Sequence, residues 1–304
     1  MSKVRSYLSL IKFSHTIFAM PFALIGFFLG VFEYTSVVPG WHTLVFPPQF
    51  DWMALLRKLG LVVLCMVFAR SAAMAFNRYL DRHFDARNPR TAIREVPAGV
   101  ITPKNALLFT LVNCFLFVIT TYFINSICFY LSPVALAVVL GYSYTKRFTP
   151  FCHLILGAGL SLAPIGAYLA VTGSFALLPI LFSVTVIFWV SGFDIIYALQ
   201  DVEFDKSNQL YSIPAWLGKG HALRVSEFLH LLSAAAVVYA GKYGQFGWLY
   251  WAGVLVFCGM LVYQHSVVKP NDLRRVNLAF MTANGIASVI FAVFVIADLF
   301  ISKI

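Results

Sequence analysis

The stretch Phe175–Tyr197, FALLPILFSVTVIFWVSGFDIIY, decides the fold class. It carries a single charged side chain, Asp194, over the roughly 20 residues that an α-helix needs to cross the hydrocarbon core of a bilayer. Strands of membrane barrels instead alternate polar and apolar residues in segments of about 10, and Leu177 to Val190 shows no such alternation. The stretch therefore predicts a transmembrane helix.

The rest of the chain has the same character. Its 304 residues are 61% hydrophobic and 11% charged, which excludes an ordinary soluble domain. Charges and turn residues divide the chain into nine apolar segments: 14–32, 53–76, 105–121, 124–142, 152–171, 175–197, 225–241, 246–267 and 277–301. We therefore predict an all-α, polytopic transmembrane bundle of about nine helices that forms a single domain over residues 1–304.

The positions of Lys and Arg predict the orientation of this bundle. Basic residues in short loops stay on the cytoplasmic side of a membrane. With the N-terminus inside, most of the 22 Lys and Arg residues fall in loops on that side, and the odd number of spans places the C-terminus outside. Because this topology explains the net charge of +10, we expect the lipid bilayer and not nucleic acid to be the partner of the basic residues.

The first informative acidic stretch, NRYLDRHFD, covers Asn77 to Asp85 and follows the second apolar segment. In a continuous helix, Asn77, Asp81 and Asp85 would lie within an arc of about 80°. Arg70, two turns earlier, falls in the same arc. One helix face is thus predicted to carry an amide, two carboxylates and a guanidinium, with Arg78 rotated away from it.

The second acidic stretch, DIIYALQDVEFD, covers Asp194 to Asp205 at the end of the sixth segment. Helical geometry places Asp194, Asp201 and Asp205 within an arc of about 40°, with Glu203 on the opposite side. Asp194 is surrounded by apolar residues, and an acid at the centre of a bilayer costs about 2.5 to 3.5 kcal/mol on insertion scales. Such a residue indicates a functional site.

The two acidic stretches resemble each other. Each has two carboxylates four residues apart at a helix end, then a polar loop, then a Pro-Ala turn, which is Pro97-Ala98-Gly99 in one and Pro214-Ala215-Trp216 in the other. This similarity predicts two pseudo-repeated halves whose half-sites face each other.

The chemistry of these side chains indicates a diphosphate site. Two pairs of carboxylates suit Mg²⁺, which prefers oxygen ligands and also uses phosphate oxygens of a substrate. The arginines of loop 86–94 can form paired hydrogen bonds with phosphate, and Tyr142 and Lys146 stand one turn apart at the same membrane face. No Walker loop, GxGxxG or HExxH motif offers a competing chemistry. A diphosphate at the mouth of an apolar bundle predicts a polyprenyl diphosphate as substrate.

At this point the chain resembles the UbiA family of intramembrane aromatic prenyltransferases. The family's Asn-x-x-x-Asp-x-x-x-Asp motif after its second helix is matched by Asn77, Asp81 and Asp85, and its Asp-x-x-x-Asp motif after the sixth helix by Asp201 and Asp205. The resemblance covers essentially the whole chain. Many members have Asp directly after the motif Asn, where this chain has a basic residue, so two acids and one amide remain at the first half-site.

The resemblance extends to single positions outside the motifs. The family's arginine seven residues before the motif Asn corresponds to Arg70, and its acid seven residues before the second pair corresponds to Asp194. Its two loop arginines and its Tyr-x-x-x-Lys correspond, in order, to Arg90, Arg94, Tyr142 and Lys146.

These matches imply a mechanism. Magnesium ions held by Asp81 with Asp85, and by Asp201 with Asp205, act as Lewis acids on the diphosphate. The side chains implied to bind the diphosphate are Asn77, Arg90, Arg94, Tyr142 and Lys146. Asp194 is implied to stabilise positive charge or accept a proton, and Arg70 to contact either the acceptor or the diphosphate.

The resemblance also implies an activity and a location. The activity is transfer of a polyprenyl group to an aromatic acid resembling 4-hydroxybenzoate in quinone biosynthesis, in a bacterial inner membrane with the site facing the cytoplasm. The segment Tyr197–Asp201 resembles the hydroxybenzoate branch, but Asn88–Thr91 also occurs in relatives thought to act on naphthoate acceptors of the menaquinone pathway. Naphthoate and haem acceptors therefore remain alternatives.

A proton-coupled transporter built around Asp194 is a further alternative from a different class. Against it, the acids lie at one membrane edge, and the sequence contains no pair of broken helices that would meet at the bilayer midplane.

Overall fold

The computed structural model describes residues 3–11, 18–35 and 51–302, and these residues form an all-helical bundle. The helices are α1 (Lys3–Leu10), α2 (Met20–Thr35), α3 (Trp52–Leu80), α4 (Arg82–Arg87), α5 (Pro103–Tyr122), α6 (Ser126–Thr145), α7 (Cys152–Thr172), α8 (Leu177–Ala198), α9 (Val202–Ser207), α10 (Ile213–Leu217), α11 (Lys219–Tyr243), α12 (Trp248–Val267) and α13 (Asn284–Ser302). Apart from one isolated bridge between Lys269 and Asp272, the described residues form no β-structure.

The predicted segments correspond to the long helices of the bundle, which confirms the fold class. Among the described residues, eight helical stretches are long and apolar enough to cross a membrane, and α2 is a shorter apolar helix. The start of the first predicted segment, residues 14–17, lies outside the described residues. α11 begins at Lys219, six residues before the predicted start at 225, because Gly218 with φ 78° ends the preceding α10 there.

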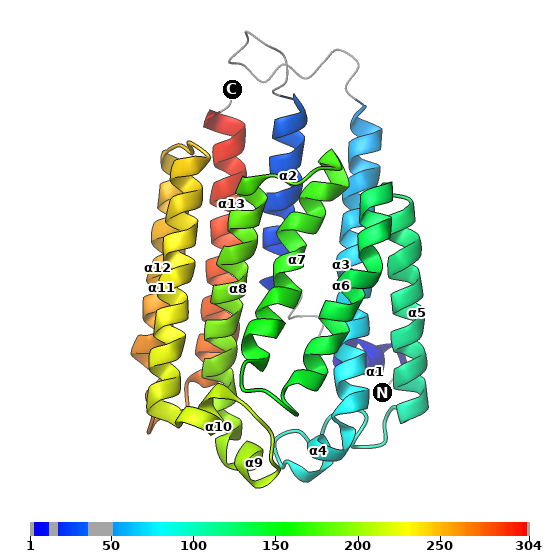
Figure 1. Ribbon diagram of the computed structural model, residues 1–304, viewed down its shortest axis with the longest axis vertical. Helices are drawn as coiled ribbons and strands as arrows, with labels where there is room; N and C mark the ends of the chain where they lie inside the picture. The colour runs from blue at the N-terminus through cyan, green and yellow to red at the C-terminus, as the bar shows by residue number, and fades with distance from the viewer. Residues whose placement is uncertain (1–2, 12–17, 36–50, 303–304) are drawn as a thin grey trace.

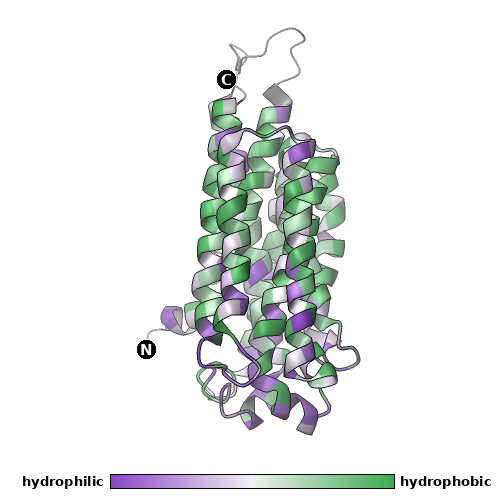
Figure 2. Cartoon of the chain, turned by 90° about the vertical axis from the view of Figure 1, so that its left-hand side faces the viewer, coloured by the Kyte–Doolittle hydropathy of each residue, from purple (hydrophilic) through white to green (hydrophobic). Residues whose placement is uncertain are grey.

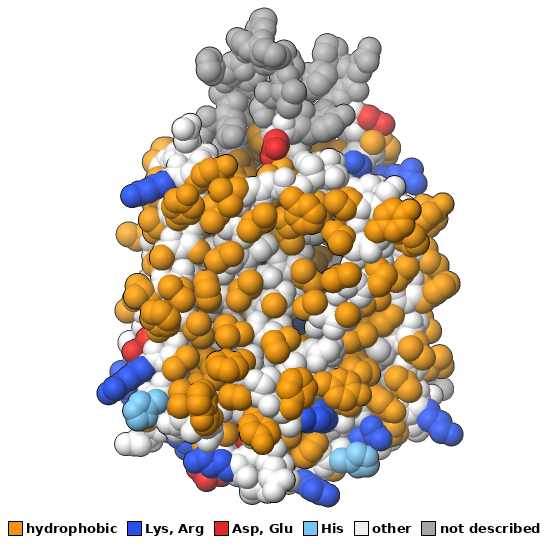
Figure 3. Space-filling view, viewed as in Figure 1, with side chains coloured by type: hydrophobic (Ala, Val, Ile, Leu, Met, Phe, Trp, Pro, Cys, Tyr) orange, Lys and Arg blue, Asp and Glu red, His pale blue; other side chains and the backbone are white. Residues whose placement is uncertain are grey.

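The long helices run side by side, and the short helices α4, α9 and α10 gather at one end (Figure 1). Helix α1 lies near this same end, whereas α13 ends at the other. Hydrophobic side chains cover the flanks of the bundle, and hydrophilic residues concentrate around the short helices (Figures 2 and 3). This distribution is the one that a bilayer around the flanks requires.

The core between α2, α8, α12 and α13 is aromatic. Phe22 lies 5.3 Å from Trp189 and 5.9 Å from Phe291, and Trp189 lies 5.9 Å from Phe257, measured between ring centroids. All four side chains are fully buried. The three pairs are tilted, with ring centroids at separations typical of packed aromatic side chains.

Two glycines permit close contacts between helices. A Cβ atom added to Gly26 of α2 would lie 2.0 Å from the carbonyl oxygen of Pro164 in α7. A Cβ atom added to Gly157 of α7 would lie 2.5 Å from the carbonyl oxygen of Ile187 and 2.6 Å from Oγ of Ser191, both in α8. Small residues at such positions let the backbones of membrane helices approach each other.

Buried polar side chains join the last helices of the chain. Asn284 accepts hydrogen bonds from Nε1 of Trp189 and Nε2 of Gln264, both at 2.9 Å. Its own amide donates to the carbonyl oxygens of Ala279 and Phe280 within the π-helix Leu278–Ala283. This network fixes the π-helix at the point where Phe280 enters the cavity described below.

Asp298 of α13 binds the N-terminus of α12. Its carboxylate accepts the backbone N–H of Gly247 at 2.8 Å and that of Tyr250 at 3.2 Å, and the side chain is 1% exposed. It thus supplies, from a neighbouring helix, the cap that the first turn of a helix needs.

Candidate active site

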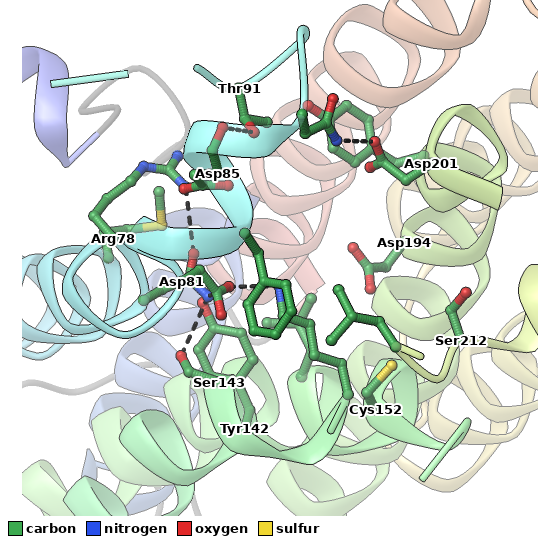
Figure 4. Close-up of a pocket in the computed structure, with 18 of the residues that line it drawn as sticks. Arg78, Asp81, Asp85, Thr91, Tyr142, Ser143, Cys152, Asp194, Asp201 and Ser212 are labelled. Atoms are coloured by element: carbon green, nitrogen blue, oxygen red, sulfur yellow. Dashed lines mark hydrogen bonds and ion pairs between the residues drawn. The ribbon is translucent and has the colours of Figure 1, made fainter. Parts of the chain in front are cut away.

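A cavity of about 580 Å³ lies at the end of the bundle where the short helices gather. Its walls come from α3 and α4 with the loop that follows, from α6, from α7, and from α8 and α9. Every site residue predicted from the sequence lines this cavity: Arg70, Asn77, Asp81, Asp85, Arg90, Arg94, Tyr142, Lys146, Asp194, Asp201 and Asp205. Figure 4 shows Asp81, Asp85, Asp194 and Asp201 around it.

The first motif stays on one face although its helix is interrupted. α3 ends at Leu80, and α4 starts at Arg82. The backbone N–H of Asp81 still donates to Asn77 at 2.9 Å, and that of Asp85 to Asp81 at 2.8 Å, so the spacing of a helical turn is kept across the break. Asn77, Asp81 and Asp85 therefore all reach the cavity, as the helical arc predicts.

The second motif also spans a break. α8 ends at Ala198, a 3₁₀ turn covers Leu199–Asp201, and α9 follows. Asp194, Asp201 and Asp205 line the cavity, whereas Glu203 is exposed and is not part of the lining. The predicted separation of Glu203 from the other acids is thus observed.

Basic side chains neutralise the acids of the first motif. Asp81 forms ion pairs with Lys146 at 2.5 Å and with Arg147 at 2.8 Å. Asp85 pairs with Arg94 at 2.7 Å. Because the partners of Asp81 come from the end of α6, these pairs fix α6 against the end of α3.

The second motif is held partly from the first half of the chain. Arg90 forms an ion pair with Asp201, and Nδ2 of Asn88 donates to the same carboxylate at 3.1 Å. Burial lowers the pKa of Arg90, but the hydrogen bond and charge of Asp201 more than offset it, so the pKa lies above its ordinary value. Asp205 accepts a hydrogen bond from Ser212, which also caps α10. The loop after α4 therefore ties the two motifs together across the cavity.

Comparison with known proteins identifies the family that shares this arrangement. Residues 20–286 match the UbiA prenyltransferase family. The chain belongs to this family and is an integral membrane protein. Its relatives include 4-hydroxybenzoate octaprenyltransferases of Nitrosomonas europaea (30% identical over 244 residues, 80% of this chain and 82% of the relative) and Vibrio cholerae (30% over 243 residues, 78% and 83%).

Solved structures of UbiA homologues have the same fold. The apo structure of the homologue from Aeropyrum pernix K1 is 25% identical, with a TM-score of 0.76 over 95% of this chain and 98% of that one. The homologue from Archaeoglobus fulgidus bound to GPP and Mg²⁺ is 20% identical, with a TM-score of 0.68 over 97% and 99%. The family resemblance inferred from the two Asp motifs is thereby confirmed.

The cavity of this UbiA-family chain also contains Arg78, which the helical arc places away from the first motif. The helical arc rotates Arg78 away from Asn77, but the structure places Arg78 in the cavity lining, 5% exposed, with Nη1 donating to Oδ1 of Asn77 at 3.3 Å. The expectation was wrong because a single-helix projection ignores the length of an arginine side chain. Nε of Arg78 and Nε of Arg70 are both buried without a hydrogen-bonding partner.

A histidine that no sequence motif indicates also lines the cavity. The histidines show no metal-ligand spacing in the sequence, which favours packing or surface roles for them, and two of them, His15 and His42, lie outside the described residues. His153 at the start of α7 is buried, lines the cavity and contacts Asp194 at 2.7 Å between Nδ1 and Oδ2. No signal within the sequence joins these two residues, since 41 positions separate them.

The acids of the cavity fit a magnesium ion that also binds substrate oxygens. The described residues contain no group of three or more His, Cys, Asp or Glu side chains close enough to hold a metal by themselves. Mg²⁺, however, usually takes only one or two carboxylates and completes its shell with water and phosphate oxygens. Oδ2 of Asp85 is buried without a hydrogen-bonding partner, which leaves one carboxylate oxygen available as a ligand.

Proposed function

We propose that this chain is a magnesium-dependent polyprenyltransferase that transfers the prenyl group of a polyprenyl diphosphate to an aromatic acid resembling 4-hydroxybenzoate. The observation that carries the proposal is that one cavity, at one end of an apolar bundle, collects both Asp pairs together with Arg90, Arg94 and Lys146. The relatives named 4-hydroxybenzoate octaprenyltransferase favour this acceptor over naphthoate or haem. Family membership favours an enzyme over the transporter alternative.

The polar part of the cavity would hold the diphosphate. Magnesium held by the two Asp pairs would supply Lewis-acid stabilisation of the leaving group. Arg90, Arg94 and Lys146, now paired with Asp201, Asp85 and Asp81, lie where they can donate to phosphate oxygens. Asn77 and Tyr142 complete this set, and donors fixed in place before the reaction stabilise the charge that develops on the leaving diphosphate.

The apolar part of the cavity would receive the allylic carbon and the acceptor. Phe18, Phe193 and Phe280 form a wall in which ring centroids lie 5.4 to 5.6 Å apart. Such a wall excludes the water that would otherwise quench an allylic cation. Asp194 lines the same cavity and would stabilise positive charge or accept the ring proton, and Arg70 would contact the acceptor or the diphosphate.

We further infer that the cavity opens toward the cytoplasm of a bacterial inner membrane and that the domain contains two related halves. The first inference is supported by the basic side chains that surround the cavity end of the bundle (Figure 3). The second is supported by the contribution of one Asp pair and one helix break from each half of the chain.

Single substitutions combined with a magnesium-dependent assay test the proposal. With a labelled polyprenyl diphosphate, a panel of aromatic acids and Mg²⁺, we expect prenylated product and released diphosphate. The substitutions Asp81→Ala, Asp85→Ala, Asp201→Ala and Asp205→Ala should each nearly abolish turnover, because each removes a proposed metal ligand.

Glu203→Ala is the matched control, since Glu203 lies on α9 close to Asp201 and Asp205 but is exposed outside the cavity. It should keep most of the activity. Product formation that is unchanged when magnesium is removed, or a Glu203→Ala variant as inactive as Asp201→Ala, would contradict the proposed site.

A further inference from the structure

His153 makes two hydrogen bonds that define the state of its ring. Nδ1 lies 2.7 Å from Oδ2 of Asp194, and Nε2 lies 3.4 Å from the backbone nitrogen of Ile213, at the start of α10. A backbone N–H can only donate, so Nε2 must be the unprotonated acceptor. The ring proton therefore resides on Nδ1 and is directed at the carboxylate of Asp194. This hydrogen bond fixes the direction of the Asp194 carboxylate.

Asp194 depends on this single contact for its orientation. Within the described part of the chain, His153 is the one side chain hydrogen-bonded to it. The Asp194 side chain is 23% exposed and lines the cavity, and Figure 4 shows its carboxylate directed inward. One oxygen is thus tied to the imidazole, while the other is available to a molecule in the cavity.

The backbone around the pair is fixed by contacts between α7 and α8. Oγ of Ser191 donates to the carbonyl oxygen of His153 at 3.1 Å, and Gly157, one turn after His153, lies against Ile187 and Ser191. Residues three or four positions apart share a helix face. The face of α7 that carries His153 is therefore held directly against the face of α8 that carries Asp194.

We propose that His153 is a positioning residue for prenyl transfer, one that holds the carboxylate of Asp194 in place and aims its free oxygen at the acceptor ring. The inference rests on the proposed function. In the step it serves, the carbon–oxygen bond of the prenyl diphosphate breaks and its electron pair leaves with diphosphate. A π pair of the aromatic ring forms the new carbon–carbon bond, and the ring proton then passes to Asp194 while the electrons of the carbon–hydrogen bond restore aromaticity.

Two substitutions of similar size separate the hydrogen bond to Asp194 from all other roles of His153. The amide nitrogen of Asn in His153→Asn can occupy the position of Nδ1 and donate to Asp194, whereas Leu in His153→Leu cannot. Both variants lose the acceptor for the N–H of Ile213, so that loss is matched between them. His153→Leu should lower kcat about 10-fold to 100-fold, and His153→Asn should recover most of that loss.

Binding of the prenyl donor separates a positioning role from a purely structural one. Structural damage to the cavity would weaken donor binding as well as lower kcat, whereas loss of positioning should lower kcat alone. A non-hydrolysable prenyl diphosphate analogue with Mg²⁺ should bind His153→Leu within about twofold of the unsubstituted chain. In an Asp194→Asn background, His153→Leu should cause little additional loss of kcat, because residues that act through one interaction are not additive. If His153→Leu does not fold, His153→Ser, which is polar but too short to reach Asp194, should show the same loss of kcat.

Several results would overturn the inference. These are a His153→Leu variant with unchanged kcat, equal losses in His153→Leu and His153→Asn, weaker binding of the donor analogue without a change in kcat, or a full additional loss in the Asp194→Asn background. Failure of the proposed function is distinguishable, because the unsubstituted chain would then form no prenylated product with any aromatic acid.

Discussion

The substitution Gly157→Ala tests whether the packing of α7 against α8 sets the geometry of the active site. The added Cβ atom would lie 2.5 Å from the carbonyl oxygen of Ile187, a backbone atom that cannot rotate away. Ordinary van der Waals contact begins at 3.4 Å, so the two helices must separate locally by about 0.9 Å. Strain of this kind in a packed interior costs about 1 to 3 kcal/mol of stability.

The same separation would act on the pair formed by His153 and Asp194. Their hydrogen bond of 2.7 Å would lengthen to about 3.6 Å if the shift passed to it in full, which is outside the range of a hydrogen bond. A displacement of about 1 Å near reacting groups can cost on the order of 100-fold in rate. We therefore expect kcat for prenyl transfer to fall 10-fold to 100-fold in Gly157→Ala, with donor-analogue binding preserved.

Initial rates in detergent micelles, together with the melting temperature of each variant, measure both effects. Gly166→Ala is the matched control on the same helix, since a Cβ atom added there meets nothing within 4 Å. This control should keep full activity and lose no stability, because replacing a helical glycine by alanine is favourable by about 0.5 to 1 kcal/mol when space allows. A folded Gly157→Ala variant with unchanged kcat would refute the link between helix packing and Asp194.

Two further predictions concern the binding of anions and metal. Arg70→Ala should raise the KM of the aromatic acid more than that of the prenyl donor, because Arg70 lines the cavity with Nε unpartnered and a lost ground-state contact appears in KM; equal effects on both substrates would instead assign Arg70 to the diphosphate. Magnesium and a non-hydrolysable prenyl diphosphate analogue should each raise the affinity for the other by the same factor in titration calorimetry, and Asp81→Asn and Asp205→Asn should each reduce that factor. Analogue binding that ignores magnesium would exclude a metal clamp.

The helix spans, and the residues of the two motifs that line the cavity, could be predicted from the sequence because both depend on local periodicity. Charged and turn residues mark the ends of apolar segments, and the spacing of Asn77, Asp81 and Asp85 remains helical even where α3 gives way to α4. Asp194 and Asp201 also line the same cavity, although a 3₁₀ turn lies between them. Positions related by one turn of a helix share a face regardless of what surrounds them.

The partners of these side chains could not be predicted in the same way. Asp81 pairs with Lys146 and Arg147, and Asp194 pairs with His153, because α3 packs beside α6 and α8 beside α7. Which helices are neighbours follows from shape complementarity along their whole length, including a small residue such as Gly157, and no short motif encodes it. Contacts of this kind decide how each acid is neutralised and oriented.

The hydrogen bonds between Asp298 and the start of α12 bear on how the last two helices enter the membrane. The N–H groups of Gly247 and Tyr250 obtain this partner only when α13 lies beside α12. Without α13 beside it, α12 would expose unpaired backbone donors. An unpaired α13 would carry an isolated acid through the bilayer, and each of these states costs a few kcal/mol of free energy. Pairing of the two helices satisfies the donors and the acid together, and we therefore expect the hairpin of α12 and α13 to integrate into the membrane as one unit. Release of a chain truncated before α13 would leave its penultimate helix as a substrate for membrane quality control.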